Sequence, residues 1–190
     1  TYNSGAEALT MGNKTSALEY FQKALTMAES LGEEGAEVVT NCKNAIPSVI
    51  LSIGKEFYNN KDFSNAKAKF VEAAEVAKKY GNEEVTAEVE SLLPTVGKRI
   101  ALAKVNEAMK NKDIAGVLAG YEEAMAIDTT DANTALKYGQ FLGNTGKFDD
   151  AVKYLELAAR HGQEGNAKSV LSTTFLKNAA AQLKAGKYAE

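Results

Sequence analysis

The side chains that most often carry out catalysis or bind metals are scarce in this sequence. One residue is a cysteine, Cys42, and one is a histidine, His161. A nucleophilic cysteine needs a base beside it, and a zinc site needs several ligands that converge. We therefore expect Cys42 to pack as a small apolar side chain. We expect His161, which precedes Gly162, to lie at the C-terminal end of a helix, near the negative end of the helix dipole.

The acidic residues that occur in pairs are neighbours in the sequence: Glu33 and Glu34, Glu83 and Glu84, Glu122 and Glu123, Asp149 and Asp150. General acid–base chemistry needs two carboxyl groups in different environments across a cleft, which sequence neighbours do not provide. We interpret these pairs as favourable charges at helix starts and on outward faces. The glycines occur singly, without a phosphate-binding loop. The sequence therefore predicts no enzyme, no cofactor and no metal site.

Charge and hydropathy exclude two further classes of partner. The chain has 22 Lys and Arg against 25 Asp and Glu, a net charge of −3, so we expect no nucleic acid partner. The most apolar stretch, between Lys43 and Lys55, contains Pro47 and is far shorter than the roughly 20 residues of a membrane-spanning helix. We expect no membrane insertion. The sequence does not indicate an oligomeric state.

A short phrase recurs along the chain: a polar turn, an aromatic or aliphatic residue, then a helix with small, large and small residues at steps of four and three. The turns are at Gly12-Asn13-Lys14, Lys61-Asp62-Phe63, Lys112-Asp113-Ile114, Gly146-Lys147-Phe148 and, opening a fifth copy, Gly186-Lys187-Tyr188-Ala189. Those steps place the three residues on one helical face. Small residues allow neighbouring helices to approach closely. We predict burial of Ala17, Phe21, Ala66, Phe70, Tyr121, Ala151 and Leu155.

A second helix precedes each turn, and two of these helices carry a glycine followed three residues later by a large apolar residue: Gly54 with Phe57, and Gly139 with Leu142. Together the two helices resemble the tetratricopeptide repeat. The resemblance implies an all-α, right-handed α-solenoid of helix–turn–helix repeats that forms a single domain over residues 1–190. That domain has about four units and the start of a fifth. We interpret the sequence as a fragment whose last helix exposes an apolar stripe including Leu176 and Leu183.

The repeats differ in length. Their spacings are 49, 51 and 34 residues, and only the last matches the family's period. The two additional segments resemble each other and contain Ile46-Pro47-Ser48-Val49 and Leu93-Pro94-Thr95-Val96. A proline disrupts a helix interior, so each segment is either a separate short helix or part of a long kinked helix, which we favour. The predicted helices are 2–12, 15–31, 34–60, 63–80, 83–111, 114–127, 132–145, 148–161 and 165–185.

In the tetratricopeptide family, the first helices line a concave groove that binds peptides. The resemblance places these groove residues at Lys55, Tyr58, Asn59, Arg99, Asn106, Lys110, Gln140 and Asn144, with Leu51, Leu102, Asn133, Leu136, Leu176 and Lys184 beside them. None of them is acidic. The resemblance implies a binding scaffold for a protein or peptide, and the charge favours an acidic or extended segment. The family's clamp for C-terminal carboxylates is not matched as a set.

An alternative function is that of an exported accessory protein for carbohydrate or nutrient uptake, because helical-repeat folds also serve such roles. Glycan sites usually use exposed aromatic platforms, and the chain has no tryptophan. Localisation stays open. The polar composition with a single cysteine slightly favours an exported or periplasmic protein over a cytoplasmic one.

Overall fold

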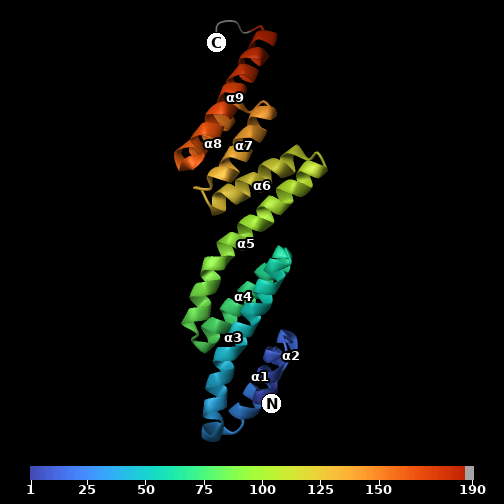
Figure 1. Cartoon of the computed structure of the whole chain (residues 1–190), viewed down its shortest axis with the longest axis vertical. Helices are drawn as coiled ribbons and strands as arrows, with labels where there is room; N and C mark the ends of the chain where they lie inside the picture. Colours follow the sequence, from blue (N-terminus) through green and yellow to red (C-terminus); the bar gives the residue numbers. More distant parts are fainter. Residues whose placement is uncertain (187–190) are drawn as a thin grey trace. The chain divides into compact units, whose positions relative to one another are not determined.

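The regular structure of residues 1–186, which the computed structural model describes, is helical and contains no strand. The helices are α1 (Tyr2–Thr10), α2 (Lys14–Glu29), α3 (Ala36–Asn59), α4 (Phe63–Tyr80), α5 (Glu83–Lys110), α6 (Ile114–Ile127), α7 (Ala132–Asn144), α8 (Phe148–Ala158) and α9 (Glu164–Lys184), with short turns η1 (Gly32–Gly35) and η2 (Ala159–Gln163) (Figure 1). This confirms the predicted all-α fold of helix–turn–helix repeats. The predicted opening of a fifth copy, Lys187-Tyr188-Ala189, lies outside the described residues.

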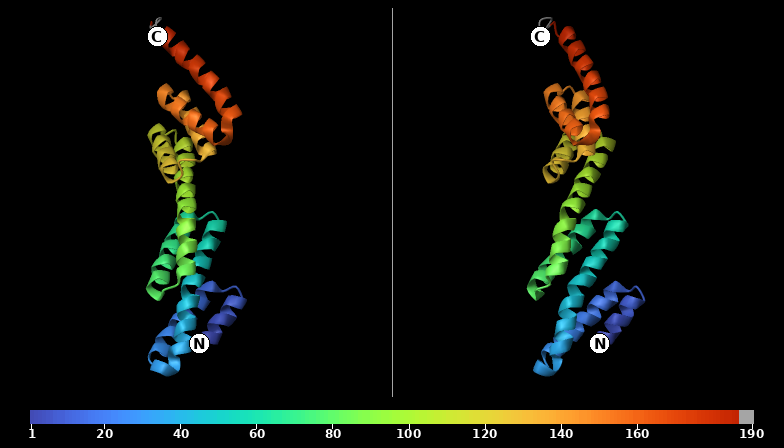
Figure 2. Two further views of the ribbon diagram at one scale, coloured as in Figure 1. Left: turned by 90° about the vertical axis from the view of Figure 1, so that its left-hand side faces the viewer. Right: turned by 60° about the vertical axis from the view of Figure 1, so that its left-hand side comes forward.

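The chain divides into two compact units, unit 1 from Thr1 to Ile100 and unit 2 from Ala101 onward. The single helix α5 contributes its first part to unit 1 and its last part to unit 2. In unit 1, α2 packs against α3 and α3 against α4. In unit 2, α7 packs against α8 and α8 packs against α9, and these helices lie side by side in the views of Figures 1 and 2. A single repeat domain over the whole chain stays a prediction.

The same turn follows the first helix of every repeat. Its central residue has a positive φ, between 56° and 82°, at Gly12, Lys61, Lys112, Gly146 and Gly186. In each turn the amide of that residue donates to the carbonyl oxygen three residues earlier, with N–O distances from 2.9 to 3.5 Å. Glycine adopts this left-handed backbone without steric cost, and two lysines adopt it here. The turn therefore reverses the chain in the same way each time.

After the turn, short polar side chains start three of the second helices. The side chains of Asn13, Asp62 and Asp113 accept hydrogen bonds from backbone amides three residues later, at 3.0 to 3.2 Å. Such caps satisfy amides that have no partner within the helix. These three repeats thus fix the start of their second helix locally. In the fourth repeat, Lys147 takes this position without a side-chain cap.

Close contact between the two helices of a repeat depends on a glycine in the first helix. A Cβ atom added to Gly54 would lie 2.7 Å from the ring of Phe70, and one added to Gly139 would lie 2.7 Å from Cγ of Leu155. Gly5 has the same relation to Phe21. In each pair the large residue follows the glycine by 16 residues. The predicted core residues are confirmed, since Ala17, Phe21, Ala66, Phe70, Tyr121, Ala151 and Leu155 are all at most 4% exposed.

In the third repeat the two helices also approach closely, but the glycine is in the second helix and the larger residue is in the first. Val105 occupies the position of the first-helix glycine, 16 residues before Tyr121. The glycine is instead in the second helix: a Cβ atom on Gly120 would lie 2.6 Å from Cγ2 of Val105. The close approach of the helices is therefore kept, while the residue that permits it changes sides.

The additional segments lengthen the helices. Pro47 lies within α3 and Pro94 within α5, and each helix is assigned as one continuous element. Separate short helices, the less favoured alternative, are thus wrong. Pro47 is fully buried in unit 1, whereas Pro94 is exposed. The helices that precede the additional segments are also longer. α2 and α4 have 16 and 18 residues, whereas α6 and α8 have 14 and 11.

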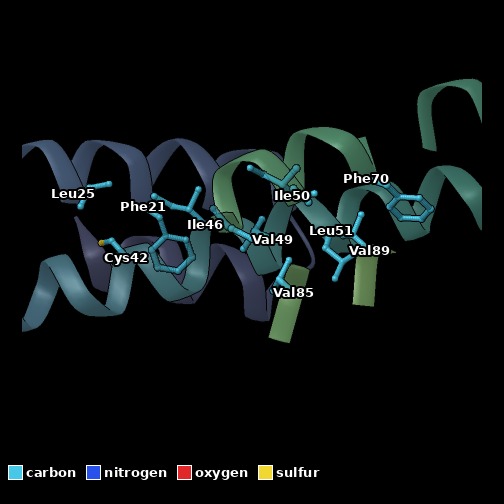
Figure 3. Close-up of a cluster of buried hydrophobic side chains, with 14 of the residues drawn as sticks. Phe21, Leu25, Cys42, Ile46, Val49, Ile50, Leu51, Phe70, Val85 and Val89 are labelled. Carbon is cyan, nitrogen blue, oxygen red and sulfur yellow. The ribbon is translucent and has the colours of Figure 1, made fainter. Parts of the chain in front are cut away.

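The first half of α3 extends the core of unit 1. Cys42 and Ile46 are buried in one cluster with Phe21 and Leu25 of α2 (Figure 3). Farther along the cluster, Val89 of α5 lies near Leu51. The residues beyond the family's usual repeat length are therefore integral to the hydrophobic core.

Candidate functional site

In unit 1, the predicted groove residues have different environments. Leu51 is 4% exposed and belongs to the core, so it offers no surface to a partner. The Tyr58 ring is half-buried and packs edge-on against Phe63, with ring centroids 5.3 Å apart. Lys55 and Asn59 are exposed. Among the predicted groove residues, α3 thus presents to solvent two polar side chains and part of one aromatic ring.

The expectation that this face carries no acid is wrong around Lys55. Its ammonium group forms an ion pair with the carboxylate of Glu88, from the first half of α5. The amide of Asn82, just before α5, donates to the carbonyl oxygen of Asn44 in α3 at 3.5 Å. The segment interpreted as an insert therefore lies along α3. Sequence reasoning missed Glu88 because it aligned α3 with the last part of α5.

The predicted residues on α5 share one stripe of that helix. Arg99, Asn106 and Lys110 are separated by seven and four residues and are all exposed, which is the spacing of a single helical face. Leu102 of the same helix is half-buried against the core of unit 2. Arg99 belongs to unit 1, and Asn106 and Lys110 belong to unit 2. Within unit 2, this part of α5 thus presents one amide and one basic side chain.

In unit 2, the structure places the last two predicted residues in one hollow. Gln140 and Asn144 of α7 face α9 across a pocket of about 240 Å³. The remaining lining residues all come from α9: Ser169, Val170, Thr173, Thr174 and Lys177. The ammonium group of Lys177 donates a hydrogen bond to Oδ1 of Asn144. The residues that line this pocket include no Asp or Glu.

The two residues of α9 that the sequence placed beside the groove differ from the residues of α9 that line this pocket. Leu176 and Lys184, inferred for the fifth unit, are exposed and do not line it. The residue that lines it is Lys177, next to Leu176 in sequence. Counting back from the turn at Gly186 does not find it: that count gives Leu176 and Lys184, which stand ten and two residues before Gly186, as Leu136 and Asn144 stand before Gly146. Among the flanking residues, Leu136 is half-buried and packs against the core of unit 2.

Asn133, at the start of α7, is also engaged. Its side-chain oxygen accepts a hydrogen bond from Nε2 of Gln163 at 2.7 Å. The oxygen of Gln163 in turn accepts from Nδ2 of Asn166 at 2.7 Å. This chain of amides joins α7 to the start of α9. Asn133 therefore supports the position of α9 at one end of the pocket.

A cluster of aromatic rings fixes α6, α7 and α8 together. The rings of Tyr121 and Tyr138 are stacked with centroids 5.1 Å apart, and those of Tyr138 and Tyr154 are 4.4 Å apart. The Tyr138 hydroxyl donates to Oε1 of Glu122 at 3.2 Å. Burial, and then the nearby charge of Glu122, raise the pKa of Tyr138 well above its usual range. The cluster holds the helix that carries Gln140 and Asn144.

The residues with the greatest intrinsic reactivity are placed without partners for chemistry. Cys42 is fully buried, and burial raises the pKa of its thiol. His161 is exposed in η2, after the end of α8, and the following Gly162 has a φ of +104°.

Within residues 1–186 no three His, Cys, Asp or Glu side chains gather as metal ligands. No helix in that range is long and apolar enough to cross a bilayer.

Comparison with known proteins gives a family match at the N-terminus. Residues 2–31 match the family model of the tetratricopeptide repeat. No curated protein sequence matches the chain. Among solved structures, it is similar to the C-terminal TPR-containing domain of a protein from Plasmodium falciparum described as FK506-binding. The identity is 18% and the TM-score 0.44, covering 75% of this chain and 95% of that one.

Proposed function

We propose that the chain, whose residues 2–31 match the family model of the tetratricopeptide repeat, is a scaffold that binds a segment of another protein. Repeats of this family generally serve protein interactions. The proposed partner is an extended, acidic peptide segment. The observation that carries this proposal is the pocket between α7 and α9, where Gln140, Asn144 and Lys177 converge.

The chemistry of the pocket supports a peptide ligand with a carboxylate. Lys177 and Asn144 are 33 residues apart in sequence, and the ammonium group of Lys177 donates a hydrogen bond to the side chain of Asn144. An incoming carboxylate can replace the Asn144 oxygen as the acceptor for Lys177. The amides of Gln140 and Asn144 can then donate to the ligand's carboxylate or backbone carbonyls. A pocket of about 240 Å³ suits one acidic side chain rather than a cofactor, since cofactor pockets usually exceed 300 Å³.

We propose the remaining predicted residues as further contacts, each within its own unit. On α5, Arg99 of unit 1 and Asn106 and Lys110 of unit 2 are all exposed. Lys55, Tyr58 and Asn59 on α3 contribute less, because Glu88 already neutralises Lys55. We therefore rank the α7–α9 pocket first, the α5 stripe second and the α3 residues third.

The proposal is tested with a fluorescein-labelled hexaglutamate peptide, and with hexaglutamine as the neutral probe. Fluorescence anisotropy at low ionic strength should show binding of hexaglutamate. Lys177→Glu should weaken it by about tenfold, because a charge that attracts the ligand becomes one that repels it. Raising the salt concentration should weaken binding by the native chain. At physiological ionic strength, the attraction between exposed charges is largely screened beyond about 8–10 Å.

Lys168→Glu is the matched control, with the same charge change on the same helix. Lys168 pairs with Glu164 at 2.6 Å and does not line the pocket. It should leave the affinity for hexaglutamate within about twofold of the native value, because Lys168 does not line the pocket. Equal weakening by both substitutions would reduce the effect to net charge and contradict the pocket. Equal affinity for hexaglutamine would contradict the acidic ligand.

A further inference from the structure

A second hollow lies in unit 1, between the turn after α1 and the last turns of α3. Its volume is about 440 Å³, which is within the range of small-molecule sites. Ile53 and Phe57 of α3 line it and are half-buried against the core of unit 1. Met11, just before the turn residue Gly12, adds an exposed apolar side chain. The hollow therefore offers an apolar surface to a ligand.

Two opposite charges meet at this hollow. The ammonium group of Lys14, the first residue of α2, lies 2.9 Å from Oε2 of Glu56 in α3, and both residues line the hollow. The Lys14 side chain is only 29% exposed, so its charge is screened less than that of a fully exposed lysine. A ligand with a single charge would pair with one of these groups and bring a like charge toward the other. The two charges together therefore favour a ligand that carries both signs.

Lys14 departs from the phrase that recurs along the chain. Two residues after the turn residue, the other three complete repeats have a large apolar residue: Phe63, Ile114 and Phe148. Phe63 packs against Tyr58 of its own repeat, with ring centroids 5.3 Å apart. The repeat architecture therefore does not require a lysine at this position. In the first repeat the lysine instead places a cation beside an apolar lining.

We propose that this hollow binds a free α-amino acid with a large apolar side chain. The carboxylate of the ligand pairs with Lys14 and its ammonium group with Glu56. Both ligand charges are attached to one carbon atom, so they are close enough together to match two protein charges 2.9 Å apart. The Glu56 side chain is 58% exposed, and an ion pair open to water costs little to rearrange. The side chain of the ligand then contacts Ile53, Phe57 and Met11.

The test is a titration of L-leucine into the isotope-labelled chain, followed by the NMR shifts of the backbone amides. We expect saturable shifts centred on residues 11–15 and 53–60, which contain the lining of the hollow. Isocaproate is leucine without the ammonium group, and isoamylamine is leucine without the carboxylate. Each should bind about tenfold more weakly, because one protein charge is left without its counter-charge. Glycine should also bind about tenfold more weakly, because it has no apolar side chain to remove from water.

Lys14→Ile introduces the residue type that the third repeat has at this position. It should keep the helical circular dichroism of the native chain and weaken the binding of L-leucine by about tenfold. Lys67→Ile is the matched control, at an exposed position of α4 outside the hollow, and should leave the affinity within about twofold. Equal weakening by both substitutions would overturn the proposal. So would the absence of saturable shifts at residues 11–15 and 53–60, or an affinity for isocaproate, isoamylamine or glycine equal to that for L-leucine.

Discussion

At the scale of single residues, the tight contact between the helices of a repeat is the most sensitive feature. Gly139→Ala should destabilise the protein by about 1–3 kcal/mol, because its Cβ atom would lie 2.7 Å from Leu155 Cγ in a packed core. Denaturant unfolding measures the change. Gly165→Ala is the control: no atom lies within 4 Å of its Cβ position, so it should be neutral or stabilising by up to about 1 kcal/mol.

The exchange of sizes in the third repeat predicts a coupled effect. Gly120→Ala should cost about 1–3 kcal/mol, because the new Cβ atom would meet Val105 at 2.6 Å. In a Val105→Ala background the same substitution should cost less, since the obstructing Cγ2 atom is gone. A double-mutant cycle of unfolding free energies measures the coupling. Strictly additive effects would show that the contact does not set the spacing of these helices.

A large core residue provides a third expectation at this scale. Phe70 is 1% exposed and contacts Gly54 closely, so Phe70→Ala should destabilise the protein by about 3–5 kcal/mol. The neighbouring Val71 is 39% exposed, and Val71→Ala should change stability by less than about 1 kcal/mol. A loss below about 1 kcal/mol for Phe70→Ala would contradict its assignment to the core.

The same residues show what the sequence could predict. The steps of four and three among alanines and aromatic residues identified the buried face, because burial and helical geometry act on the same few residues. The residues proposed to contact a ligand were harder to predict from the sequence. Lys177 and Glu88 are polar, and their positions depend on where α9 and α5 pack. The spacings of 49 and 51 residues give the length of the two inserted segments, but periodicity in one sequence does not show which helix each segment packs against.

At the scale of the helix, the two internal prolines are a matched pair. An interior proline costs about 3 kcal/mol relative to alanine. Pro94 is exposed, so Pro94→Ala should stabilise the protein by a large part of that amount. Pro47 is fully buried, so Pro47→Ala should gain less, because removing the ring leaves a void in the core. Thermal unfolding of both variants measures the difference, and a larger gain at Pro47 would contradict it.

At the scale of the whole molecule, the α5 stripe is tested by reversing two charges. Arg99→Glu with Lys110→Glu should weaken binding of hexaglutamate at low salt, because two charges that attract the ligand become charges that repel it. The control is Lys23→Glu with Lys67→Glu, which changes net charge equally at exposed positions of α2 and α4. Anisotropy measures both. Unchanged affinity for the first pair would remove the stripe from the binding surface.

The tyrosine cluster makes the molecule sensitive to alkali. The pKa of Tyr138 is raised in the folded chain by burial and by Glu122. Burial also raises the pKa of Tyr121. The unfolded chain loses these protons near pH 10, while the folded chain keeps them. The contribution of these tyrosines to stability should therefore be constant below about pH 10 and fall as the pH rises above it. Tyr138→Phe should flatten this decline in a denaturant titration.

That cluster also gives the protein a spectroscopic signature of its own. The chain has eight tyrosines and no tryptophan, so tyrosine alone shapes its near-ultraviolet spectrum in the region where tryptophan would dominate. Rings held 4.4 and 5.1 Å apart at fixed angles couple their electronic transitions, and that coupling disappears when the helices separate. Circular dichroism near 280 nm is thus a built-in, label-free reporter of the packing of α6, α7 and α8.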